Sequence, residues 1–210
     1  MAIRKRLSKG ILLTGATTAA VIIGTAGVAL AAITFTITPG GAITAKAGTT
    51  TLTDTNTGSV LSCKSSSSTG TLKKGSGIAG TNLGSITKLT FSTCTGPLGL
   101  TFTVTNSHFP WKLSGTSYKS GVTTGFISGI HSVLSGPGCT ATVDGTGATA
   151  NNGKVKVTYT NSTGKLKVLT TGGNLHVYKV SGCAGLINSG DTTTFSGSYT
   201  VTPKQTITSP

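Results

Sequence analysis

Alternation between apolar and small polar residues recurs along most of this chain, and it restricts the fold more than any other feature of the sequence. The runs ITFTIT (33–38), LGLTFTV (98–104), KVKVTYT (154–160) and FSGSYTV (195–201) place their large apolar residues on one side of an extended chain. Successive side chains of a strand point to opposite faces, so these runs predict strands with one buried face. Turn sequences rich in glycine, asparagine and proline separate the runs.

The composition favours the same fold class. Threonine, serine and glycine contribute 43, 23 and 31 residues, and glutamate does not occur. Threonine has a branched Cβ that suits a pleated strand, whereas the helix-favouring residues Glu, Gln, Met and Arg are almost absent after residue 32. We therefore expect an all-β domain of the β-sandwich or jelly-roll kind, without a helix of any length. The serine-rich run at 64–77 is expected to be a mobile loop.

The first 31 residues are organised like a secretory signal peptide. Arg4, Lys5, Arg6 and Lys9 precede an apolar stretch at 11–30, which ends in a small-x-small cleavage pattern at 29–31. The alternative is an uncleaved anchor, since about 20 apolar residues can span a bilayer. The glycines and threonines of the stretch and its cleavage pattern favour removal. We expect a mature protein at 32–210 that forms a single domain and has no membrane span.

Four cysteines in an exported chain indicate two disulfide bonds, which can pair in three ways. The segments after Cys94 and Cys183 are similar, because each cysteine precedes a small residue, a glycine and leucines. Cys63 and Cys139 stand upstream of these segments. This arrangement indicates a weak internal duplication, with halves at about 32–115 and 116–210, and favours the pairs Cys63–Cys94 and Cys139–Cys183. The motif is interpreted as scaffold, since no cysteine is left over and no C-x-x-C pair suggests a metal site.

Acidic residues and histidines offer few candidates for catalysis. The only side-chain carboxylates belong to Asp54, Asp144 and Asp191, and each lies in a turn sequence where an aspartate hydrogen-bonds its own backbone. An enzyme would need two of them, or a histidine and an aspartate, to converge in one cleft. The histidines are irregularly spaced, match no metal motif, and accompany no G-x-S-x-G sequence; they are His108, His131 and His176. We expect no catalytic residue, no metal and no cofactor.

An aromatic cluster surrounds the only tryptophan, in the sequence NSHFPWKL. His108, Phe109 and Trp111 could form a ligand platform that stacks on a sugar ring, which requires Trp111 to be exposed. The alternative is a plug at the end of the domain, which the large apolar area of these side chains favours.

The lysines are the remaining feature of the sequence that indicates a possible binding function. After residue 31 the chain has 13 lysines, no arginine and only the three aspartates, a formal net charge of +10. The segment KVKVTYTNSTGKLKV (154–168) predicts a hairpin of two strands. Alternation along these strands places four lysines on one outer face: Lys154, Lys156, Lys165 and Lys167. Such a patch suits anionic cell-wall polymers or acidic polysaccharides. Specific nucleic-acid binding is not expected, because phosphate sites usually use arginine. Alternatively, the lysines only keep strand edges soluble.

Several segments together resemble a group of small secreted proteins of actinobacteria, mostly of unknown function. The segments are TCTGPLGLTFTV, SGPGCTATV, SGCAGLINSGD and FSGSYTVTPKQTITSP. A fainter resemblance is to the secreted PraB-like proteins called activators of alkane oxidation. The first resemblance implies an extracellular or cell-surface location, and neither supplies functional residues.

These observations predict a noncatalytic secreted or cell-surface protein with a structural or interaction role. The alternative is a carbohydrate- or cell-wall-binding module that uses Trp111 and the lysine patch. A terminal strand left exposed would also allow self-association between copies.

Overall fold

A computed structural model describes residues 32–210 of the chain. The predicted signal peptide lies outside the described residues. Within residues 32–210, no helix has the length and apolar character that crossing a membrane would require.

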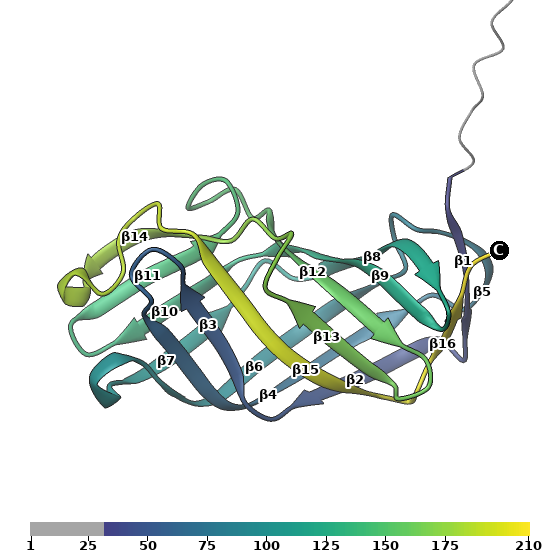
Figure 1. The fold of residues 1–210 in the computed structure, drawn as a ribbon, viewed down its shortest axis with the longest axis horizontal. Coiled ribbons are helices and arrows are strands. Elements are labelled where there is room, and N and C mark those ends of the chain that lie inside the picture. Colours follow the sequence, from purple (N-terminus) through teal and green to yellow (C-terminus); the bar gives the residue numbers. More distant parts are fainter. Residues whose placement is uncertain (1–31) are drawn as a thin grey trace, which may run out of the picture. The chain divides into compact units, whose positions relative to one another are not determined.

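The described residues fold almost entirely into strands joined by short turns (Figure 1). The strands are β1 (Thr34–Thr38), β2 (Gly41–Ala47), β3 (Thr50–Asp54), β4 (Val60–Leu72), β5 (Gly75–Ala79), β6 (Gly84–Thr95), β7 (Thr101–Asn106), β8 (Trp111–Lys119), β9 (Val122–Ile130), β10 (Ser132–Gly136), β11 (Cys139–Asp144), β12 (Gly153–Thr160), β13 (Lys165–Leu169), β14 (His176–Gly182), β15 (Thr193–Thr202) and β16 (Thr206–Thr208). Two three-residue 3-10 turns, η1 (Pro97–Gly99) and η2 (Cys183–Gly185), are the only helical segments of this part of the chain. The prediction of an all-β domain is confirmed.

Thirteen strands form one antiparallel sheet that closes on itself. Five pairs of consecutive strands act as segments of one longer strand; the pairs are β2 with β3, β7 with β8, β9 with β10, β11 with β12, and β13 with β14. Within each pair the two members pair either with one shared neighbour or with the two members of a neighbouring pair. Each long strand then pairs with the next along the chain, and β15 returns to pair with both β2 and β3. In Figure 1 the layer with β12, β13 and β15 lies in front of the layer with β4 and β6. Closure leaves few unpaired edges and gives the sheet a continuous inner face.

The inner face of the closed sheet forms the main core. Alternate residues of each strand point inward; in β12, Val155, Val157 and Tyr159 are buried while the residues between them are half-buried. A second, three-stranded sheet of β16, β1 and β5 adds a smaller core, in which Phe35 and Ile37 are fully buried. The pattern in ITFTIT therefore predicted both a strand and its buried face.

Both disulfides have the predicted pairing, Cys63–Cys94 and Cys139–Cys183. Each joins neighbouring antiparallel strands: Cys63 lies opposite Cys94 in β4 and β6, and Cys139 lies opposite Gly182, the residue before Cys183. The later cysteine motif of each half contains a short 3-10 turn, η1 just after Cys94 and η2 starting at Cys183.

Two local predictions are wrong. The serine-rich run is not a mobile loop, because most of it forms β4, which is paired along both edges with β2, β3 and β6. Ser66 and Ser68 point inward and are buried, so strand pairing outweighs their low strand propensity. The run LGLTFTV is a strand only from Thr101, since Pro97 starts a 3-10 turn that leaves Leu98 88 % exposed.

Candidate functional site

The predicted lysine hairpin is present. β12 and β13 pair in antiparallel register, with Thr158 opposite Lys167 and Thr160 opposite Lys165. Residues opposite one another share a face, so Lys154, Lys156, Lys165 and Lys167 all lie on the outside of the closed sheet. Lys165 and Lys167 are exposed and the other two are half-buried.

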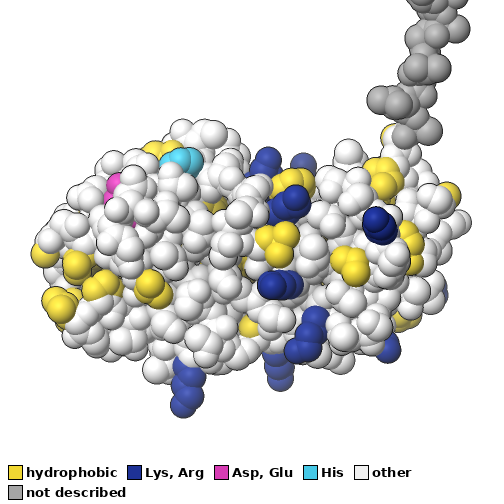
Figure 2. All heavy atoms as spheres, viewed as in Figure 1, with side chains coloured by type: hydrophobic (Ala, Val, Ile, Leu, Met, Phe, Trp, Pro, Cys, Tyr) yellow, Lys and Arg dark blue, Asp and Glu magenta, His cyan; other side chains and the backbone are white. Residues whose placement is uncertain are grey.

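Closure of the sheet extends this patch beyond the hairpin. Thr200 of β15 pairs with Lys165 on one side and with Lys46 of β2 on the other, which puts Lys46 in the same cross-strand row. Ser128 of β9 likewise lies between Lys154 and Lys112 of β8. We call this set of six lysines the lysine face; it runs along the outside of the closed sheet across six adjacent strands, from β8 through β9, β12, β13 and β15 to β2. Its members are Lys46, Lys112, Lys154, Lys156, Lys165 and Lys167. Figure 2 shows lysine side chains gathered over the middle of the molecule, where β12, β13 and β15 lie in Figure 1.

The lysines of the lysine face have no carboxylate partner. Asp144 is fully buried and Asp54 is 2 % exposed, so Asp191 is the only aspartate that reaches the surface. No lysine within residues 32–210 forms a salt bridge; the one contact in this region between a carboxylate and a basic side chain is that of Asp144 with His131. Lys154 instead lies over the ring of Phe126, with its Nζ 4.9 Å from the ring centroid. The lysine charges are therefore free to meet a polyanion.

The aromatic cluster packs into the main core, as expected if it closes the end of the domain. Trp111 is 2 % exposed, and its indole N–H donates to the Ser107 carbonyl at 2.9 Å. Phe109 stacks on the Trp111 ring with a centroid distance of 4.7 Å. A sugar platform that uses an exposed Trp111 ring is thus excluded, because the ring belongs to the core. His108 stays exposed beside it.

His131 and Asp144 meet, which the sequence did not predict. The His131 Nδ1 lies 2.9 Å from Asp144 Oδ2, at the point where β9 passes into β10 and β11 ends. The His108 ring contacts the His131 ring edge-on at 4.7 Å, and the Ser107 hydroxyl lies 2.9 Å from His108 Nδ1. Within residues 32–210, no three histidine, cysteine or aspartate side chains are arranged to hold a metal ion.

The surroundings of Asp144 indicate a structural role for this pair. Its carboxylate accepts hydrogen bonds from the backbone N–H groups of four residues that begin and end the loop between β11 and β12: Gly145, Asn151, Asn152 and Gly153. Burial alone would raise the pKa of the Asp144 carboxyl, but the hydrogen bonds from His131 and the loop outweigh it and hold the pKa below its ordinary value. The carboxylate holds the loop, and Asp144 lines neither the cavity inside the closed sheet nor the pocket between the two cysteine motifs.

The turn interpretation holds for all three aspartates. Asp54 Oδ1 accepts from the N–H groups of Asn56 and Thr57, and Asp191 Oδ2 accepts from Asn188. Residue spacing could not show that two of these turns would be buried, because burial depends on how distant strands close around them.

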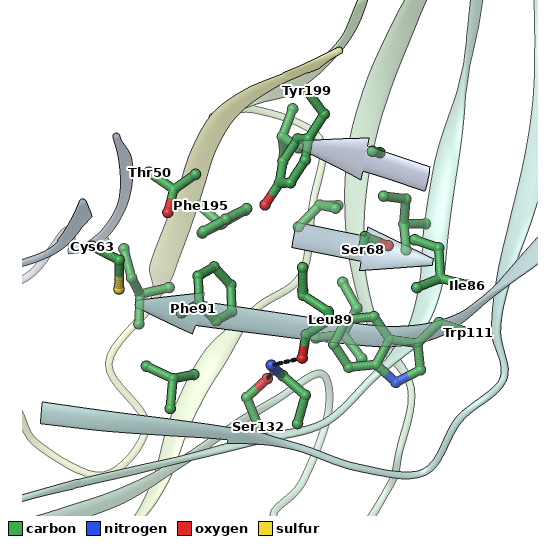
Figure 3. A pocket seen from close by; sticks show the side chains of 18 of the residues that line it. Thr50, Cys63, Ser68, Ile86, Leu89, Phe91, Trp111, Ser132, Phe195 and Tyr199 are labelled. Atoms are coloured by element: carbon green, nitrogen blue, oxygen red, sulfur yellow. Dashed lines mark hydrogen bonds between the residues drawn. The ribbon is translucent and has the colours of Figure 1, made fainter. Parts of the chain in front are cut away.

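A cavity of about 110 Å³ lies inside the closed sheet (Figure 3). Apolar side chains from both layers line it, among them Leu89, Phe91 and Phe195, together with the edge of Trp111. The Tyr199 hydroxyl accepts a hydrogen bond from Ser66, while burial raises the pKa of Tyr199 to about 12. The Thr50 hydroxyl is also buried here without a hydrogen-bond partner.

Comparisons with protein families, with characterised proteins and with solved structures found no match to this chain.

Proposed function

We propose that this protein works outside the cell as a noncatalytic binding protein, and that its lysine face adsorbs to anionic polymers of the cell surface. An extracellular location is supported by two disulfides, which persist in oxidising compartments, and by the signal-like first 31 residues. The single observation that carries the binding proposal is a face with six lysines and no carboxylate partner.

The strand spacing suits a polymer better than a compact anion. Lys46 and Lys165 are two strands apart, which corresponds to about 10 Å between their backbones. No arginine fork is present to hold one phosphate or carboxylate in fixed geometry. Contacts of this kind are diffuse and additive, and salt weakens them because the Debye length is only about 8 Å at physiological ionic strength.

Sedimentation with purified bacterial cell wall tests this proposal. Disulfide-intact protein at 32–210 should pellet with wall at low salt, stay in solution without wall, and leave the pellet as salt rises. The hairpin variant, Lys154→Gln, Lys156→Gln, Lys165→Gln and Lys167→Gln, should remain in the supernatant.

A charge-matched control separates the lysine face from net charge. Lys64, Lys73, Lys88 and Lys179 are exposed and lie outside the hairpin, and their replacement by glutamine removes the same four charges. This control variant should still pellet. Equal losses in the two variants would show that only net charge matters, and no pelleting of the unmodified protein would refute the proposal.

A further inference from the structure

One wall of the cavity inside the closed sheet is built from small side chains. Ala45 of β2 pairs with Ser68 of β4, and Ala47 pairs with Ser66 in the next inward-facing pair. Ala45 and Ser68 line the cavity, and Ala47 and Ser66 are buried beside them. Inward positions of a strand usually carry larger branched or aromatic side chains, which pack the interior. The serine-rich run of β4 therefore leaves space inside the sheet.

The larger side chains around this wall do not fill the space. Leu89 and Phe91 of β6 lie opposite the two serines, and Phe195 points inward from β15 (Figure 3). The Phe91 and Phe195 rings meet edge-on, with their centroids 5.8 Å apart. Leu89, Phe91 and Phe195 all line the cavity, yet each is only half-buried. Because protein interiors leave few voids larger than a water molecule, the core is underfilled here.

The wall of the cavity offers no site for a charged ligand. Among residues 32–210, no charged side chain lines it. The Ser132 hydroxyl donates to Asn106 Oδ1 at 2.6 Å, and Asn106 Nδ2 donates to the Leu89 carbonyl at 3.0 Å. The Tyr199 hydroxyl is likewise occupied. Thr50 Oγ1 has no partner, but it also has essentially no accessible surface, so a molecule in the cavity does not reach it. Burying a charge without partners is costly, so this wall selects a neutral ligand.

A second apolar pocket, of about 130 Å³, adjoins the cavity at one end of the closed sheet. Leu52, Leu61 and Leu134 border both spaces. The two cysteine motifs, about 90 residues apart in the chain, supply the outer sides of this pocket, and Figure 1 shows their turns η1 and η2 at the same end. Leu98 of the first motif is exposed there. This end therefore provides an apolar approach to the cavity.

We propose that the cavity inside the closed sheet binds a compact neutral hydrocarbon no larger than benzene. Its volume of about 110 Å³ is somewhat smaller than that of an engineered apolar cavity of about 150 Å³ in another protein, which stays dry and binds benzene or xenon. A hydrocarbon in this space gains dispersion contacts with the half-buried side chains and brings no polar group that lacks a partner. Water is a poorer occupant, because a buried water needs roughly two to four polar partners.

Titration of disulfide-intact protein at 32–210 with benzene tests this site. The NMR signals of the Leu89 methyl groups and of the Trp111 indole N–H should shift, because both residues line the cavity, while those of Leu98 should not. Benzylamine is protonated at neutral pH and should not bind, since no carboxylate lines the cavity. Mesitylene overfills the space and should bind roughly tenfold more weakly than benzene. Equal affinity for the three compounds would overturn the proposal. So would the absence of shifts at saturating benzene, as when water fills the cavity, or shifts confined to Leu98.

Filling variants locate the site independently of the probe. Ser68→Leu and Ala45→Val add carbon atoms to the wall of small side chains and should weaken benzene binding roughly tenfold. Ser67→Leu makes the same change on the outer face of β4, and Leu98→Ser alters only the adjoining pocket, so both should leave the affinity unchanged. The hairpin variant should also bind benzene like the unmodified protein. Fluorescence of the buried Trp111, recorded without benzene, shows which variants are folded. Unchanged affinity in folded Ser68→Leu and Ala45→Val would contradict the assignment.

Discussion

Replacing Asp144 by alanine should destabilise this protein more than any other single change to a charged side chain. The carboxylate is fully buried and accepts from His131 and from four backbone N–H groups, at 2.6 to 3.2 Å. Each buried donor left unpaired costs about 1–3 kcal/mol. Because the loop can open and let water reach some of these donors, the costs do not add fully, and we expect about 3–5 kcal/mol, as for other broken buried pairs. Domains of this size have only about 5–15 kcal/mol in total.

Urea unfolding at pH 7 measures this loss, with the fluorescence of the single tryptophan as the signal because Trp111 is buried in the core. Asp191→Ala is the matched control. Its carboxylate accepts only from Asn188 in an exposed turn, so it should cost about 1 kcal/mol. If Asp144→Ala costs no more than Asp191→Ala, the carboxylate does not hold the loop and the structural role assigned to the His131–Asp144 pair is wrong.

The pH dependence supplies a second test of the same residue. The folded pKa of Asp144 lies below its ordinary value of about 4, so the folded state binds this proton more weakly than the unfolded state does. Its contribution to stability is complete above that ordinary value and is lost as pH falls through the folded pKa. The protein has only three aspartates and no glutamate, so the stability of Asp144→Ala should vary much less between pH 5 and pH 2 than that of the unmodified protein.

Three further outcomes follow from the buried groups and the disulfides. Burial raises the pKa of Tyr199 to about 12 and also raises the pKa of Tyr159, so ultraviolet titration should find late-ionising tyrosines, with Tyr199 among them. Stability should fall above pH 10 because the unfolded tyrosines ionise first, and ionisation of Tyr199 at pH 10 would contradict its burial. Acrylamide should quench Trp111 fluorescence several-fold less than free indole, and quenching equal to free indole would restore the sugar platform. Replacing Cys139 and Cys183 by serine should lower the free energy of unfolding in urea by about 4 kcal/mol, because the unfolded chain loses the constraint of a loop that spans 44 residues. Non-reducing peptide mapping of the native protein should show no crossed disulfide pairs.

Much of this architecture could be predicted from local sequence. Alternation identified β1, β12 and β15 with their buried faces, because a half-buried strand imprints its period of two on the sequence. The similarity of the two cysteine motifs predicted both disulfides. The hairpin lysines followed from the same alternation, since a hairpin keeps the faces of its two strands in register.

What could not be predicted depends on strands that are distant in sequence. Sheet closure places Lys46 in the same cross-strand row as Lys165, with Thr200 between them, and nothing near either residue in the sequence indicates that arrangement. β4 forms from a serine-rich run because neighbours pair with both of its edges, which outweighs its local propensity. The pocket at the cysteine motifs and the buried state of Asp54 likewise require both halves of the chain to meet.

The salt dependence of binding to a defined glycerol-phosphate polymer tests the central claim most directly. The logarithm of the affinity should fall linearly as the logarithm of the salt concentration rises. Each lysine that displaces a counterion should add about 0.7 to the slope, as for single-stranded polyphosphates. The four hairpin lysines should therefore make the slope of the unmodified protein steeper by about 3 than that of the hairpin variant. The charge-matched control variant should keep nearly the full slope. Identical slopes for the unmodified protein and the hairpin variant would contradict the assignment of polyanion binding to the lysine face.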